Sequence, residues 1–427
     1  MFTCSKCDAQ SQKWSGRCFE CQGWGTLVED DDKTTVTKKS KTTKRATQST
    51  RLAEITGQDE HTRFGTNEPE LDRVLGGGIV KGSLVLLSGE PGIGKSTLVA
   101  DIAKRFAQQQ LSILYISGEE SGAQLKARFV RLKTDLERIS FLESDAIESL
   151  IQTIEKEQPD IVIVDSVQTL SSDQMDSPSG SPTLVRYATS LLLETAKHTG
   201  ISILLIGQVT KDGTIAGPKT LEHLVDAVLT LDGDRTHSYR WLSSSKNRFG
   251  ATDEVGVFEM TGGGLIPVQN PSARFLEERV QVPGSVIAAI VEGSRVFLVE
   301  VQALVEKTTY AAPVRRASGF DPNRLQMLIA ILSKRANIKL GEQDVYLNVI
   351  GGMKLTEPAA DLAVCAAIVS AAKNITHQLP TVFFGEVGLG GEIRRVPFQE
   401  KRVQEAKRLG MDRVFGPQAI KTLNDLL

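Results

Sequence analysis

The segment from Gly89 to Thr97 has the residue types and spacing of a phosphate-binding loop. It fits the pattern G-x-x-x-x-G-K-[ST] between a predicted buried strand (83–88) and a predicted helix (95–108). Glycines let backbone N–H groups turn around an anion, and the positive helix end adds to their attraction. Lys95 would reach the terminal phosphates, and the Ser96 hydroxyl would complete a Mg²⁺ shell. The expected nucleotide contacts are Gly89, Glu90, Pro91, Gly92, Ile93, Gly94, Lys95, Ser96 and Thr97.

Further polar side chains follow apolar runs that predict strands of the same sheet. Asp165 stands where an acidic residue is expected to orient Mg²⁺ and its waters. Glu119 could position and deprotonate the attacking water, and Glu120 competes for that role. Gln208 could register whether the γ-phosphate is present. Each could instead be a solvated residue at a strand end, an alternative that is weakest for Asp165.

Four of the five cysteines form two C-x₂-C pairs near the amino terminus: Cys4 with Cys7, and Cys18 with Cys21. Four thiolates on two tight turns fit one tetrahedral Zn²⁺, which would be structural because no coordination position is left open. A redox pair or reactive thiols are the alternative. Cys365 stands alone and is expected to be a buried apolar residue.

The composition is that of an ordinary soluble protein: 427 residues, 40% hydrophobic, 24% charged, with a formal net charge of −2. Any nucleic-acid surface must therefore be a local basic patch. No apolar run is long enough for a membrane span, and the first residues do not read as a signal peptide. We expect a cytoplasmic protein with no membrane partner.

Alternating strand and helix patterns from residue 51 onward predict an α/β fold with a mainly parallel sheet. An acidic and Lys/Thr-rich stretch without apolar periodicity precedes this part and predicts a tether. The pattern changes again near residue 270. The predicted organisation is a Cys4 zinc knuckle at 1–28, a flexible linker at 29–50, an ATPase domain at 51–270 and a further domain at 271–427.

Several motifs together resemble the bacterial RadA (Sms) family of recombination and repair ATPases. The phosphate loop, residues 162–167 and Gly207-Gln208 are similar to a RecA-type ATPase core. The RadA signature K-N-R-F-G matches Lys246, Asn247, Arg248, Phe249 and Gly250. The knuckle, the core and the carboxyl-terminal part follow in the order of that family, so the resemblance covers nearly the whole chain.

The resemblance implies a ring that binds ATP between neighbouring subunits. In such rings a basic pair spaced K-x-R reaches the nucleotide of the adjoining subunit, and Lys246 and Arg248 match that pair. Two cations brought to the γ-phosphate would neutralise the negative charge of the phosphoryl group during its transfer. The resemblance also implies that the loops that follow Asp165 and Gln208 line the channel of the ring. Lys211 and Lys219 would contact single-stranded DNA there. These loops could equally be mobile surface connections.

The carboxyl-terminal part resembles the proteolytic domain of Lon, but without its nucleophile. Where Lon has a G-P-S-A-G turn, this chain has Pro358-Ala359-Ala360, and alanine has no hydroxyl with which to attack. Lys401 lies near the expected position of the catalytic lysine, with Glu400 competing for that position. A lysine base without its nucleophile cannot perform acyl transfer, so we expect an inactive Lon-like α+β domain that holds subunits together.

The family resemblance implies a DNA-dependent ATPase that uses ATP, Mg²⁺ and Zn²⁺. Such a motor would form a homo-oligomeric, hexameric ring on single-stranded and branched DNA. With the recombinase RecA it would promote branch migration of recombination intermediates. An ATP-dependent Lon-like protease and a KaiC-like regulatory ATPase are the alternative interpretations.

Overall fold

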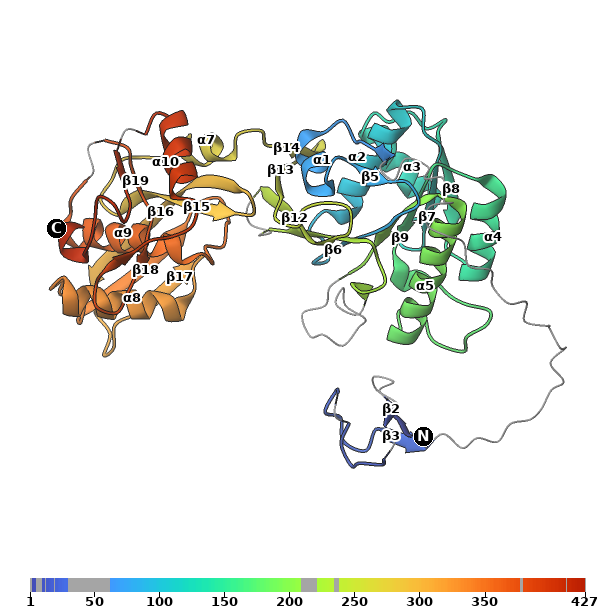
Figure 1. Cartoon of the computed structure of the whole chain (residues 1–427), viewed down its shortest axis with the longest axis horizontal. Coiled ribbons are helices and arrows are strands. Elements are labelled where there is room, and N and C mark those ends of the chain that lie inside the picture. Colours follow the sequence, from blue (N-terminus) through green and yellow to red (C-terminus); the bar gives the residue numbers. More distant parts are fainter. Residues whose placement is uncertain are drawn as a thin grey trace, which may run out of the picture.

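A computed structural model describes residues 2–4, 10–11, 13–18, 20–29, 62–208, 221–233, 238–376, 379–411 and 413–426. Figure 1 shows the two large sheets of the chain in two lobes that meet near β12, β13 and β15. We call residues 62–267 the central unit and residues 271–426 the C-terminal unit. The amino-terminal residues form a small antiparallel sheet of order β2-β1-β3. Its strands are β1 (Phe2–Cys4), β2 (Gln10–Ser11) and β3 (Leu27–Glu29).

The described residues of the central unit form a nine-stranded sheet of order β14-β13-β12-β11-β6-β10-β9-β7-β8. The strands from β11 to β8 are parallel to one another, and β12, β13 and β14 extend the sheet in antiparallel fashion. The bounds are β6 (Leu84–Gly89), β7 (Ile113–Ser117), β8 (Ile139–Glu143), β9 (Ile161–Asp165), β10 (Ser202–Ile206), β11 (Ala227–Asp232), β12 (Tyr239–Asn247), β13 (Val255–Thr261) and β14 (Gly264–Pro267). A separate pair joins β4 (Arg63–Phe64) to β5 (Ile79–Val80).

Helices cover both faces of this sheet because its inner strands are apolar on both sides. In β6, Val85 and Leu87 pack with helices α1 to α3, whereas Leu84 and Leu86 pack with α4 and α5. Alternate residues of a strand point to opposite faces, so a continuous apolar run is what a doubly covered strand requires. The bounds are α1 (Pro69–Leu75), α2 (Lys95–Gln108), α3 (Gly122–Arg131), α4 (Ile147–Glu157), the 3₁₀ turn η2 (Val167–Thr169) and α5 (Pro182–Thr199).

The C-terminal unit is built on a six-stranded mixed sheet of order β17-β18-β16-β15-β19-β22. Its longest strands, β15 (Ser285–Glu292) and β16 (Arg295–Lys307), form a hairpin whose tip points at the central unit. The other strands are β17 (Arg315–Ser318), β18 (Gln343–Val349), β19 (Thr381–Phe383) and β22 (Arg413–Phe415), with a two-stranded pair of β20 (Glu386–Val387) and β21 (Ile393–Arg394).

Helices also lie on both faces of this second sheet. In β15, Val286 and Ala288 face the core with α8 and α9, while Ile287 and Ala289 face the core with α10. Residues 358–360 form a 3₁₀ turn, and an alanine-rich α-helix starts at Asp361. The bounds are α7 (Pro271–Leu276), α8 (Pro322–Arg335), η3 (Pro358–Ala360), α9 (Asp361–Lys373), α10 (Gln399–Arg408) and η4 (Leu423–Leu426).

The predicted α/β class is confirmed, with a mainly parallel core sheet, an amino-terminal cysteine cluster and a carboxyl-terminal α+β unit. Within the described part of the chain, none of the helices has both the length and the hydropathy that a membrane crossing needs.

Candidate nucleotide-binding site and metal knuckle

The segment with the phosphate-loop pattern lies at the carboxyl ends of the parallel strands. Strand β6 is flanked by β10 and β11, both parallel to it, so the carboxyl ends of these strands meet at one sheet edge. A cavity of about 320 Å³ opens there. It is lined by Pro91, Gly92, Gly94, Lys95, Ser96, Thr97, Glu119, Arg128, Asp165, Ile206 and Gln208. The structure thus brings the predicted loop and the strand-end residues into one pocket.

Lys95 is the first residue of α2 and lies inside the loop, with only 6% of its surface exposed. Its Nζ donates hydrogen bonds to the carbonyl oxygens of Gly89 and Glu90, each at 2.9 Å. Burial lowers the pKa of Lys95, and the carboxylates of Glu119 and Asp165 oppose that shift. The Lys95 ammonium group lies at the loop centre and faces two carboxylates. It is therefore suited to hold an anion next to them.

Gly94 gives the loop a backbone conformation that would strain a larger residue. Its φ is +115°, in the region that favours glycine, and a Cβ there would lie 2.4 Å from the Cε atom of Met260 on β13. The backbone therefore turns directly against the side chain of β13. Helix α2 begins at Lys95, and its first residues line the pocket, so the free N–H groups of its first turn are available there to a phosphate.

Asp165 ends β9 and is 3% exposed. Its Oδ2 accepts a hydrogen bond from the Tyr115 hydroxyl at 3.0 Å. Burial raises the pKa of Asp165, while hydrogen bonds from Ser96 and Tyr115 act in the opposite direction. Ser96 and Asp165 thus place a hydroxyl and a carboxylate side by side at the pocket, a donor set of hard oxygens that fits Mg²⁺.

Glu119 and Gln208 are joined directly, although they come from different strand ends. The Oε1 atom of Glu119 accepts hydrogen bonds from Gln208 Nε2 at 2.7 Å and from Ser166 Oγ at 2.8 Å. Two donors from two neighbouring strand ends fix the direction of this carboxylate at the pocket wall. Gln208 and Glu119 therefore form one hydrogen-bonded unit at the pocket wall.

Glu120 takes a different direction because α3 supplies it with a partner. Its carboxylate forms an ion pair with Arg128, which lines the pocket and has a buried Nη1 atom with no hydrogen-bond partner in the described structure. The Glu120 N–H is held by Ser117 Oγ at 3.0 Å. Sequence reasoning did not single out Arg128. No local spacing rule pairs the two residues, because Glu120 precedes α3 (Gly122–Arg131).

Lys246 and Arg248 lie at the opposite edge of the sheet from the pocket. Asn247 is paired with Ala227 on β11, which is paired with Val85 near the start of β6, whereas the pocket begins at Gly89. Val85 and Gly89 are roughly 13 Å apart along the strand. Neither basic residue is among the described residues that line the pocket. Within one chain the pair cannot serve the nucleotide of its own loop.

The turn that carries this pair is held in a defined conformation. A register shift between Val228 and Leu229 places a bulge in β12 just before Lys246, and such bulges re-aim side chains. Lys246 Nζ donates to the Glu222 carbonyl at 2.6 Å, and Arg248 Nη1 lies 3.3 Å from Asp226 Oδ1. Burial lowers the pKa of Lys246, and the charge of Arg248 adds to that effect.

The predicted metal knuckle is supported by its described ligands. The sulfur atoms of Cys4, Cys18 and Cys21 lie within 4.8 Å of one another, and those of Cys4 and Cys21 are 3.6 Å apart. In a tetrahedral Zn²⁺ site, sulfur ligands at about 2.3 Å from the metal are separated by about 3.8 Å. The three thiols fit that geometry, and the fourth predicted ligand, Cys7, lies outside the described residues.

Removing a ligand tests whether the knuckle is a structural zinc site. We expect Cys18→Ser to lower bound zinc from about one ion per chain to near zero, because three ligands hold the metal poorly. Limited proteolysis should then cut residues 2–29 while the central unit stays intact. Zinc content measured by mass spectrometry checks this, with Cys365→Ala, at a buried position in α9, as the control. Full zinc retention in Cys18→Ser would contradict the assignment.

The predicted DNA contacts Lys211 and Lys219 lie outside the described residues. The other predicted channel loop, residues 171–182, is described, and α4 holds its beginning. Ser172 Oγ donates to Glu148 at 2.6 Å, and the Asp173 N–H donates to the same carboxylate at 3.2 Å. This loop begins directly after η2, which follows Asp165.

The Lon-like landmarks do not form a proteolytic centre in the structure. Ala359 is 1% exposed and packs among Val382, Phe384 and Ala406. Lys401 Nζ lies 5.0 Å from the ring centroid of Phe398. Position 359 therefore offers neither a nucleophile nor access for a peptide.

Comparisons with known proteins agree with this arrangement. A family model described as an AAA domain matches residues 49–214, and one described as a rubredoxin metal binding domain matches residues 2–29. The KaiC-like protein of Pyrococcus horikoshii OT3 is a solved structure that covers 48% of this chain and 98% of its own, with 18% identity and a TM-score of 0.41. That likeness is too low to bear on function.

Curated relatives match far more of the chain. The DNA repair protein RadA of Aquifex aeolicus is 44% identical over 422 residues, which cover 98% of this chain and 94% of the relative. The protein of the same name from Listeria monocytogenes is also 44% identical over 422 residues, covering 98% and 92%. Identity at this level over nearly the full length of both proteins shows that the chain belongs to the RadA family of DNA repair proteins.

Proposed function

We propose that this DNA repair ATPase is a ring-shaped, DNA-dependent motor in which each ATP lies between two subunits. The observation that carries the proposal is the placement of two functional groups at opposite edges of one sheet. The phosphate loop is at the carboxyl end of β6, and the basic pair Lys246 and Arg248 is near its amino end. Copies arranged head to tail can bring the pair of one subunit to the pocket of the next, and such an arrangement forms a ring when the rotation between copies closes.

We assign the roles in the pocket from its contacts. Lys95 holds the terminal phosphates, and Ser96 with Asp165 holds Mg²⁺, which supplies charge stabilisation when bound. Glu119 positions and deprotonates the attacking water, because Ser166 and Gln208 fix its carboxylate at the pocket wall. Gln208 senses the γ-phosphate. Lys246 and Arg248 of the neighbouring subunit neutralise the negative charge of the phosphoryl group during its transfer.

The motor would act on single-stranded and branched DNA, with RecA, in branch migration of recombination intermediates, most simply as a hexamer in the cytoplasm. Lys211 and Lys219 are the proposed DNA contacts. The domain limits follow the expected scheme: a zinc knuckle at 1–28, a linker at 29–50, an ATPase domain at 51–270 and an inactive Lon-like domain at 271–427. Buried Ala359 weighs against the protease alternative. ATP turnover that does not respond to single-stranded DNA would favour a regulatory ATPase instead.

The proposal is tested by ATP turnover with and without single-stranded DNA. We expect Lys246→Ala and Arg248→Ala to lose DNA stimulation and at least a hundredfold in turnover, because trans-acting cations contribute about 10³-fold in related sites. Binding of a fluorescent ATP analogue should remain, since neither residue lines the pocket of its own chain. Lys156→Ala, an exposed lysine on α4, is the matched control. Wild-type turnover in both basic variants would remove the trans-acting role.

A further inference from the structure

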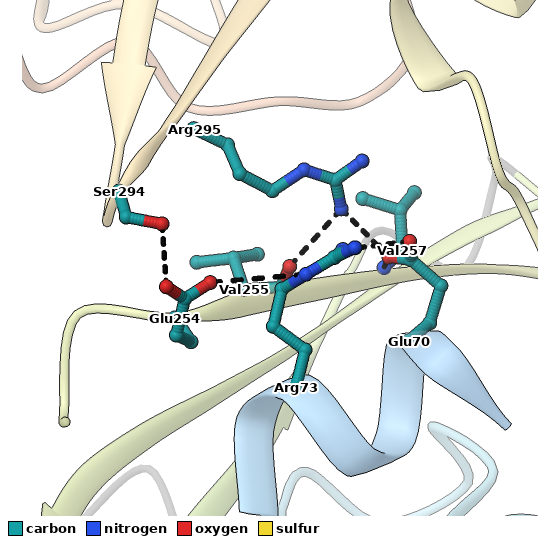
Figure 2. Close-up of polar contacts among 7 residues, drawn as sticks. All are labelled: Glu70, Arg73, Glu254, Val255, Val257, Ser294 and Arg295. Atoms are coloured by element: carbon teal, nitrogen blue, oxygen red, sulfur yellow. Dashed lines mark hydrogen bonds and ion pairs between the residues drawn. The ribbon is translucent and has the colours of Figure 1, made fainter. Parts of the chain in front are cut away.

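The tip of the β15–β16 hairpin touches the central unit through a compact set of polar contacts (Figure 2). Ser294 Oγ donates to Glu254 at 2.6 Å, and Arg295 Nη1 donates to the Val255 carbonyl at 3.2 Å. The same Nη1 atom lies 2.7 Å from Glu70 on α1. The C-terminal unit is therefore attached to the first helix of the central unit by a direct ion pair.

Glu70 is a buried carboxylate that is held by three polar partners. Its side chain is 3% exposed, it pairs with Arg73 at 2.8 Å, and it accepts the Val257 N–H at 3.0 Å. Figure 2 shows Arg295 and Arg73 both directed at it. A buried carboxylate that loses a partner is destabilised, so the position of α1 is sensitive to the seating of Arg295.

An aromatic cluster also joins the same two units. Trp241 on β12 packs against Phe297 of β16 and Phe275 of α7, with ring centroids at 5.4 and 5.8 Å. Tyr239 on the same strand packs against Phe275 at 4.9 Å. The first half of β12 is thus held by the C-terminal unit.

Both attached elements end at the Lys246–Gly250 turn. Strand β12 ends at Asn247, and α1 ends at Leu75, whose carbonyl oxygen accepts the Asn247 Nδ2 amide at 3.5 Å. Gly76, the next residue, lies beside Gly250: a Cβ on Gly76 would be in van der Waals contact with the Gly250 Cα, at 3.5 Å. Glu70 and Leu75 lie on the same short helix, so a shift of α1 at Glu70 would also move its contact with Asn247.

We propose that Arg295 is a positioning residue for the Lys246–Gly250 turn, acting through Glu70 and α1. The C-terminal unit thereby sets where the basic pair points, in addition to any role in holding subunits together. This inference rests on the proposed trans-acting role of Lys246 and Arg248. It makes the orientation of the C-terminal unit a control on ATP turnover at the neighbouring subunit.

A double-mutant cycle on turnover by the full-length protein tests this inference. We expect Arg295→Ala to lower kcat about fivefold in the presence of single-stranded DNA, with unchanged affinity for a fluorescent ATP analogue. Arg295→Lys should recover part of the loss. Asn247→Ala should also lower kcat, and the double variant should be little worse than the poorer single variant, because both changes break the same connection. A merely structural role would lower thermal stability without this non-additivity.

Arg394→Ala is the matched control, because Arg394 is 61% exposed and forms its ion pair with Glu392 inside the C-terminal unit. Arg394→Ala should change kcat only slightly. The double variant with Asn247→Ala should show the product of the two single effects on kcat. Wild-type kcat in Arg295→Ala, or independent effects of Arg295→Ala and Asn247→Ala, would overturn the positioning role. Lys246→Ala leaves the contact between the units intact, so its wild-type turnover would instead overturn the proposed function.

Discussion

Replacing Lys95 with alanine is expected to abolish ATP turnover, with a loss of about a thousandfold or more. The ammonium group lies at the centre of the loop and faces Glu119 and Asp165. Without it, the loop has no ammonium group to hold the terminal phosphates beside Glu119, so binding and turnover should both fail. Turnover and binding of a fluorescent ATP analogue measure the two effects.

Lys104→Ala serves as the control for Lys95→Ala, because Lys104 lies on the same helix, α2, but does not line the pocket. It should retain wild-type binding and turnover. If Lys95→Ala hydrolysed ATP at more than a few per cent of the wild-type rate, the pocket would not be the site of hydrolysis.

Substitutions of the adjacent carboxylates Glu119 and Glu120 are expected to have very different effects on ATP turnover. Glu119→Gln should lower turnover by about a hundredfold or more, because a positioned general base contributes about 10²–10⁴-fold. Glu120→Gln should keep turnover within a few-fold of the wild type, because Glu120 forms an ion pair with Arg128. Single-turnover hydrolysis measures both variants with ATP binding monitored in parallel.

Glu119→Gln should still bind ATP, since the amide can keep accepting hydrogen bonds from Ser166 and Gln208. A large loss in Glu120→Gln with near-normal turnover in Glu119→Gln would reverse the assignment of the two residues.

The phosphate loop and the strand-end residues could be expected from the sequence because their patterns are local. A loop between an apolar strand and a helix defines its own geometry, and parallel strands bring their carboxyl ends to one edge. This places Asp165, Glu119 and Gln208 near the loop without knowledge of the exact strand order. The α/β class follows from the same alternation.

The choice between Glu119 and Glu120 could not be made from the sequence. Both follow β7, and their directions depend on partners supplied by other elements. Ser166 and Gln208 come from β9 and β10, whereas Arg128 comes from α3. Side-chain hydrogen bonds between elements are tertiary, and no local pattern encodes them.

The place of the basic pair also needed the fold. Strand β12 pairs with β11 in antiparallel orientation, which places Lys246 at the edge of the sheet away from the pocket. Sequence periodicity does not predict this pairing. The ion pair between Arg295 and Glu70 joins residues separated by 225 positions. Such a contact leaves no signal in spacing, and only the docking of the hairpin on α1 reveals it.

Mixing two inactive variants tests the shared nucleotide site most directly. Lys95→Ala keeps the basic pair, and Lys246→Ala keeps the phosphate loop, so a mixed assembly would contain some interfaces with both intact parts. At equal amounts we predict recovery to about a quarter of the wild-type turnover, since each complete site needs one subunit of each kind in the right order. Turnover of the mixture that stayed at the sum of the two separate variants would contradict a site shared between subunits.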